Sequence, residues 1–233
     1  ISLPRQDIRD WVINHVDQGV IKKAYTSFRL SLNDNASNLD SIEAQINFSD
    51  VNLSYHEYFP DIRNIDGIAS FDKGSMFIEI DDGEVLDTKI ESASVTIEDF
   101  FAPLNFLHIR SKAIGKAEDL LKHINYKSQS SQNIKNYING LAQSNTKIIL
   151  PLSKKATLSD VLIDIESNIS DINTDILAQS MQITCKKAAK SNIFQTKVNL
   201  ADTKIIVPAL GIEKEPQIPA KLNFDVVINK NDI

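Results

Sequence analysis

Apolar and polar residues alternate at period two along most of this chain of 233 residues. Such alternation predicts half-buried β-strands, each with one apolar and one polar face. The first residues differ, because their apolar positions recur at helical spacing, at Ile8, Trp11, Val12, His15 and Val16. Gly19 favours the end of this helix. Period two then begins, which places on one face Val20, Ala24, Phe28 and Leu30.

The later alternating segments predict a meander of strands joined by short connections. Turn chemistry is expected at 72–74 and at Asp82–Gly83. Two segments with helical spacing, 116–125 and 133–143, interrupt the meander. Strands are expected within 42–55, in three parts of 65–99, and within 107–113, 146–153, 157–173, 180–186, 193–207 and 220–229.

Within two of these strands the apolar positions change parity, at Ser49–Asp50 and between Ile90 and Ala93. A strand that keeps one apolar face inward can absorb such a change only by a bulge or a bend. Residues 48–52 and 169–173 share the pattern apolar, Ser, Asp, apolar, Asn, so the same device is expected twice. There the Ser and Asp side chains are expected to bond to nearby backbone.

These patterns predict a mainly β protein with a few short helices, whose long antiparallel strands form a curved, elongated sheet or groove. Residues 1–115 are interpreted as a helix followed by an antiparallel strand meander, 116–143 as a helical insert and 144–233 as a second strand-rich part. Two arrangements of the apolar faces stay open. Either two sheets close on each other as a sandwich, or one curved sheet leaves an apolar trough.

Composition narrows the classes of function. The 25 Lys and Arg are dispersed among 31 Asp and Glu, so the net charge of -6 includes no basic stripe for nucleic acid. One cysteine allows no intrachain disulfide framework. No run of 18 apolar residues and no signal-peptide pattern occurs. We interpret the chain as a segment, 1–233, of a longer protein whose anchor or export signal lies elsewhere.

Motifs for catalysis are not found. No dinucleotide-binding, P-loop, GxSxG or HExxH pattern occurs. Residues 56–61 and 81–83 hold possible metal ligands, but a loop before proline and a hairpin turn explain them without a metal. Cys185 lies on an alternating strand and is interpreted as a small buried hydrophobe. We therefore expect neither an enzyme, a cofactor nor a metal site. An enzyme would need His56, Glu57 and other carboxylates to converge in space. The four histidines lie far apart in sequence, at His15, His56, His108 and His123.

If one-sided apolar strands with few covering helices leave an open trough rather than a closed sandwich, that trough would suit lipid. Each acyl CH₂ laid into such a trough would gain about 0.8 kcal/mol, so a chain of about a dozen carbons would bind without any polar motif. Parity selects the candidate lipid-contacting side chains, for which burial in an ordinary core is the alternative. They are Phe28, Leu30, Ile46, Phe48, Leu53, Val95, Ile97, Ile109, Ile163 and Ile165.

Three stretches carry a family resemblance. They are WVINHVDQGVIKKAYTSFRLSL, the segment from ASNLDSIEAQINFSDVNLSYHEYFPDI to SVTIEDF, and KIILPLSKKATLSDVLIDIESNISDIN. A Trp helix ending at glycine, an F-x-D-V-x-L-x-Y strand, a glycine-punctuated meander and a PLS strand follow in order. Together they resemble the central domain of the YhdP branch of the bacterial AsmA-like proteins, relatives of TamB. Sparse glycine and Asn- and Lys-rich loops depart from the family's pattern.

The resemblance implies the periplasmic part of a long β-rich protein, anchored in the inner membrane of a Gram-negative bacterium by a transmembrane helix outside this segment. It implies a bridge that moves phospholipids to the outer membrane along an apolar β-groove. The implied partners are phospholipid acyl chains and neighbouring strand repeats of the full-length protein. The family has no catalytic residues to carry over. The alternative function is a non-catalytic periplasmic scaffold or interaction domain that supports outer-membrane assembly.

Overall fold

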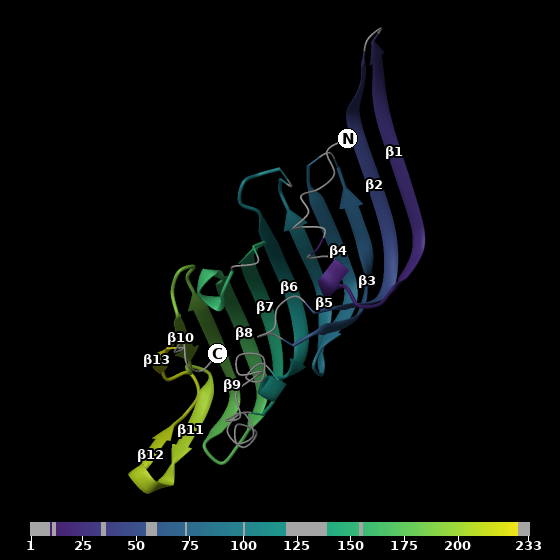
Figure 1. Ribbon diagram of the computed structural model, residues 1–233. Coiled ribbons are helices and arrows are strands. Elements are labelled where there is room, and N and C mark those ends of the chain that lie inside the picture. The colour runs from purple at the N-terminus through teal and green to yellow at the C-terminus, as the bar shows by residue number, and fades with distance from the viewer. Residues whose placement is uncertain are drawn as a thin grey trace.

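The computed structural model describes residues 10, 13–33, 36–54, 60–72, 74–99, 101–119, 139–153 and 156–227. Over these residues the chain forms one antiparallel sheet of 13 strands. The sheet is open, long and twisted, with β1 (Val20–Asn33) at one end and β13 (Lys221–Val227) towards the other (Figure 1). The predicted fold class is confirmed, because the protein is mainly β with few helical residues. No second sheet occurs in these ranges, so the two-sheet sandwich is not formed.

The strands follow chain order across the sheet from β1 to β10, and β13 then pairs with β10. A side hairpin is formed by β11 and β12, and β11 also pairs with the first residues of β9. The bounds of the other strands are β2 (Ala36–Leu53), β3 (Ile62–Phe71), β4 (Met76–Val85), β5 (Thr88–Ile97), β6 (Phe106–Lys116), β7 (Leu141–Pro151), β8 (Leu162–Asn173), β9 (Leu177–Lys187), β10 (Ile193–Asn199), β11 (Thr203–Val207) and β12 (Ile212–Lys214).

Strand register assembles one apolar face from residues far apart in sequence. Directly opposed residues of paired strands point to the same side of a sheet. One cross-strand row from β1 to β9 consists of Ala24, Ile46, Ala69, Ile78, Val95, Ile109, Ile148, Ile163 and Lys187. The adjacent row on that side consists of Ile21, Phe48, Gly67, Ile80, Ala93, Ser111, Thr146, Ile165 and Cys185. We term this side the apolar face and the opposite side the polar face.

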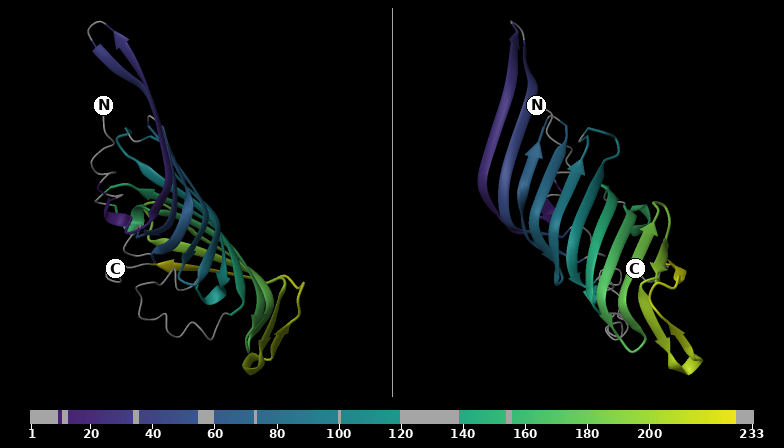
Figure 2. Two further views of the ribbon diagram at one scale, coloured as in Figure 1. Left: turned by 90° about the vertical axis from the view of Figure 1, so that its right-hand side faces the viewer. Right: turned by 180° about the vertical axis from the view of Figure 1, so that it is seen from behind.

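The main core lies over the middle of the apolar face. The connection between β7 and β8 contributes Leu152, Leu158 and Val161 to it, and Val161 is fully buried. Leu158 opens the short 3-10 helix η2 (Leu158–Asp160), which lies on the same side of the sheet as helical residues 13–15 (Figure 2). A second, smaller cluster lies over β7 to β9, around Ile169 and Met181. The chain therefore covers the centre of its own apolar face.

β-Bulges occur where the apolar parity changes. The β2–β3 register shifts between Phe48 and Val51, and the β8–β9 register shifts between Ile169 and Ile172. Asp50 and Asp171 have φ values of 56° and 55°, as the repeated pattern predicts for matching bulges. The hydroxyl groups of Ser49 and Ser170 each donate to the carboxylate of the following aspartate at 3.2 Å. The expected hydrogen bonds were to backbone. The register shift in β5, between Ile90 and Ser92, is also confirmed.

Two details of the predicted strand pattern are wrong. Asp82–Gly83 lies inside β4, where the Gly83 amide donates to Asp82 Oδ1 at a register shift, and the chain reverses at Leu86–Asp87 instead. Asp-Gly suits bulges as well as turns, which explains the error. In β1 a register shift next to Lys22 puts Ile21 on the apolar face in place of Val20.

The other predicted turn and the helices have different outcomes. The turn at 72–74 is confirmed, because Asp72 Oδ1 accepts the amides of Gly74 and Ser75, which lower the pKa of the Asp72 carboxyl. Of the insert expected at 116–143, Lys116 and 141–143 belong to strands and 117–119 are helical, while 120–138 lie outside the described residues. Of the first helix, residues 10 and 13–15 are helical.

Candidate functional site

The candidate lipid-contacting residues belong to the apolar face but differ in how far they are covered. Four of them are buried in the main core: Val95, Ile97, Ile109 and Ile163. Phe48, Leu53 and Ile165 are half-buried and pack against that core, and Ile46 is half-buried in the first row. Phe28 and Leu30 are exposed, Phe28 by 67%. Among these candidates, exposed apolar surface is therefore found on β1 rather than at the centre of the face.

The end strands β1 and β13 carry the uncovered parts of the apolar face. On β1, Ile21 is 66% exposed beside Phe28 and Leu30. On β13, alternation places Leu222, Phe224 and Val226 on the side of the sheet that carries the buried Phe194. These three side chains are 40 to 51% exposed. Sequence reasoning missed Ile21, because the register shift next to Lys22 reverses the face of this residue. It missed the β13 stripe, because alternation alone does not show which strands have a neighbour on one side only.

Lys187 is a buried cation at the β9 end of the first row, and only 1% of it is exposed. Its Nζ donates to the carbonyl oxygens of Ser159 at 3.1 Å, Val161 at 2.5 Å and Ala188 at 3.3 Å. Burial lowers the pKa of this ammonium group, partly offset by the Asp160 carboxylate. Lys187 thereby ties the η2 connection to β9 and holds Leu158 against the core. No sequence pattern marked this residue.

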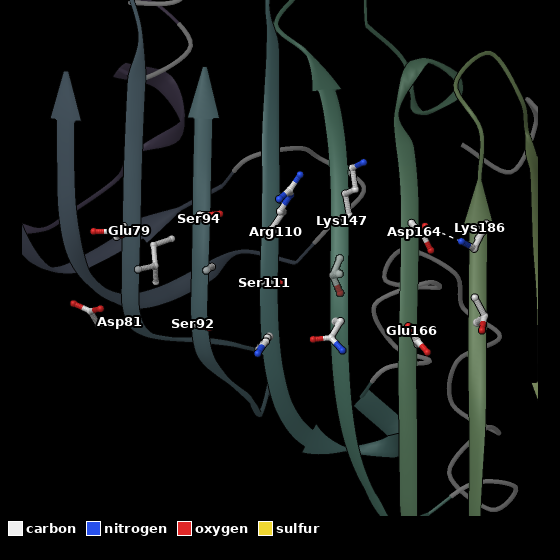
Figure 3. A pocket seen from close by; sticks show the side chains of 16 residues that line it. Glu79, Asp81, Ser92, Ser94, Arg110, Ser111, Lys147, Asp164, Glu166 and Lys186 are labelled. Carbon is white, nitrogen blue, oxygen red and sulfur yellow. Dashed lines mark hydrogen bonds and ion pairs between the residues drawn. The ribbon is translucent and has the colours of Figure 1, made fainter. Parts of the chain in front are cut away.

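The polar face carries an open depression of about 690 Å³ over β4 to β9 (Figure 3). Register places one row of its side chains in line, from Glu79 through Ser94, Arg110, Lys147 and Asp164 to Lys186. Lys186 Nζ contacts Asp164 Oδ2 at 2.9 Å, and Gln182 donates to Glu166. Exposed ion pairs of this kind contribute about 0 to 1 kcal/mol. A row of exposed polar and charged side chains of this kind is typical of a solvated outer surface.

The described lining of the depression includes neither histidine nor cysteine. Within the described ranges, no three His, Cys, Asp or Glu side chains gather in a way that could hold a metal. Cys185 is buried, as predicted, and burial raises the pKa of its thiol. His108 lies edge-on to Phe106. His56, Glu57 and His123 lie outside the described residues.

Comparisons of the chain with protein-family models, with curated proteins and with solved structures found no match. The resemblance to the AsmA-like proteins therefore stays a prediction. In the part of the chain that the structure describes, no helix combines the length and the apolar character needed to cross a membrane.

Proposed function

We propose that this chain is a segment of a bridge-type lipid carrier related to the AsmA-like proteins, and that its apolar face contacts phospholipid acyl chains. The observation that supports the proposal is the set of apolar rows running across an open sheet and left uncovered on β1 and β13. The proposal places the segment in the periplasm of a Gram-negative envelope. It assigns no catalytic residue and no cofactor.

The exposed stripe on β1 is longer than one extended acyl chain. Nine residue steps separate Ile21 from Leu30, a span of about 30 Å at the rise of a β-strand. A bilayer core, which holds two acyl chains end to end, has about the same thickness. Each CH₂ laid against this stripe would contribute about 0.8 kcal/mol. Acyl contact at this end leaves the central core residues free to stabilise the fold.

The unpaired edges of the sheet support the second part of the proposal, a continuation by neighbouring strand repeats. Among the described strands, β1 pairs only with β2 and β13 only with β10. Each therefore presents a row of backbone groups that another strand can pair with. The same edges favour the second candidate function, a scaffold that binds other envelope proteins by strand addition.

Native mass spectrometry with lipid extraction tests the proposal. The purified chain, after incubation with phospholipid, is expected to retain lipid as mass adducts. The replacement Phe28→Ser should reduce the bound fraction, because it removes an exposed ring from the apolar face. Tyr25→Ser is the matched control, since register pairs Tyr25 with Gln45 on the polar face of the same strand. Absence of lipid from the wild-type chain, or equal losses in both variants, would contradict acyl contact and favour the scaffold.

A further inference from the structure

The β11–β12 hairpin presents an uninterrupted run of residues without polar side chains. The run, IIVPALGI at 205–212, spans the end of β11, the 3-10 helix η3 (Pro208–Leu210) and the start of β12. The hairpin extends away from the main sheet at the end opposite β1 (Figures 1 and 2). Leu210 at its tip is 71% exposed, the highest value of any large apolar side chain in the described ranges. Ile206 and Ile212 beside it are also exposed.

The base of the hairpin holds this apolar tip in a fixed position. The buried Thr203 hydroxyl donates to the Ser180 carbonyl at 2.6 Å. Lys214 Nζ donates to the carbonyls of Ala201 at 3.1 Å and Thr203 at 2.7 Å. The Ile206 amide donates to the Ile176 carbonyl at 2.9 Å, which joins β11 to the turn before β9. The tip is therefore an ordered projection that exposes apolar side chains to water.

The charged side chains nearest to the tip lie at the base of the hairpin, below its last ladder pair. Lys204 Nζ contacts Glu215 Oε1 at 2.8 Å and Glu213 Oε1 at 3.5 Å. Beyond the Ile206–Glu213 pair, only one ladder step, Val207 with Ile212, and the η3 turn remain. This uncharged cap is about 5 to 10 Å tall, the depth to which interfacial elements enter the boundary between headgroups and acyl chains. Within the cap, the Gly211 amide donates to the Pro208 carbonyl at 3.1 Å.

We propose that the hairpin tip, residues 207–212, inserts into the interface of a lipid bilayer. The tip is narrow and convex, and the charged side chains of Lys204, Glu213 and Glu215 lie at its base. This shape fits a fluid, laterally uniform surface. Lys204 is paired with these two glutamates, so the insertion relies on apolar contact rather than on attraction to anionic lipids. The inference does not depend on acyl-chain binding by the apolar face, because it uses a different surface.

Site-specific fluorescence tests the proposal on the full chain in a Cys185→Ala background. An environment-sensitive dye on Leu210→Cys should shift to shorter emission wavelengths when vesicles of zwitterionic phosphatidylcholine are added. Nitroxide-labelled lipids should quench it, with little change between low and high salt. The same dye on Leu104→Cys, an exposed leucine in the β5–β6 connection, should keep its aqueous emission.

Vesicle flotation provides the second readout. The double variant Leu210→Ser and Ile212→Ser should bind phosphatidylcholine vesicles at least tenfold more weakly than the wild-type chain, whereas Leu104→Ser should bind equally well. An aqueous emission of the Leu210 dye in the presence of vesicles would overturn the proposal and leave the tip to a protein partner. Equal flotation of the double variant and the wild type would overturn it as well. Either result would leave the acyl-chain proposal standing.

Discussion

Matched replacements of two isoleucines on the apolar face measure how far the chain covers that face. Ile163 in β8 is 3% exposed within the main core, whereas Ile21 in β1 is 66% exposed. Both lie in apolar-face rows, so Ile163→Ala and Ile21→Ala remove the same atoms from the same side of one sheet. The difference in free energy of unfolding between the two variants therefore measures burial and cavity formation rather than side-chain chemistry.

The burial values set the expected magnitudes. Ile163→Ala loses nearly the whole transfer free energy of the side chain and leaves a cavity, which together cost about 2 to 5 kcal/mol. Ile21 has only about a third of its surface covered, so Ile21→Ala should cost about 1 kcal/mol or less. A folded domain has about 5 to 15 kcal/mol of stability, so both variants should fold.

Urea denaturation followed by circular dichroism provides the assay. With a slope of about 2 to 3 kcal/mol per M, the two midpoints should differ by about 1 M, while the slopes stay equal. Equal midpoints for the two variants would refute the reasoning. They would show that the centre of the apolar face is no better covered than its β1 end.

Two further predictions concern Lys187 and the glycine in the second apolar row. Burial puts the folded pKa of Lys187 below the unfolded value of 10.5, so the unfolded chain binds more protons just below that pH and stability rises with pH there. In parallel urea titrations, the free energy of unfolding of the wild type minus that of Lys187→Met should therefore increase as the pH rises towards 10.5. A difference that does not change with pH would contradict this. Gly67→Ala should lower the thermal midpoint at a cost of about 1 to 3 kcal/mol, because its Cβ would collide with the Glu79 carbonyl. Gly74→Ala, whose nearest neighbour would lie at 3.6 Å, should stay within about 0.5 kcal/mol of wild type, and similar losses in both would count against the close packing at Gly67.

Local patterns predicted most of the fold, because each strand keeps its own apolar face. The side chain period is two, so a change of parity inside a strand must be matched by an extra residue. This is why the alternation alone identified Ser49–Asp50 and its later counterpart as bulges. The same logic failed at Lys22, where the parity change falls at the start of β1 and too few residues precede it to define a face.

The state of the candidate site could not be predicted, because it depends on which strands meet. Alternation placed Phe28 and Val95 on one face, and the register shows what each contacts only after all the strands are paired. Val95 has a neighbouring strand on both sides, whereas Phe28 lies on an edge strand. The buried Lys187 also escaped prediction, because its partners are backbone carbonyls, which leave no mark in the sequence.

Photocrosslinking at adjacent positions of β1 tests the central claim most directly. A photoreactive phenylalanine analogue at position 28 faces the uncovered part of the apolar face, and one at position 29 faces the other side of the same strand. In the presence of phospholipid vesicles and light, the account predicts a lipid adduct at position 28 and none at position 29. Equal capture at both positions, or capture at neither, would contradict acyl-chain binding by this face.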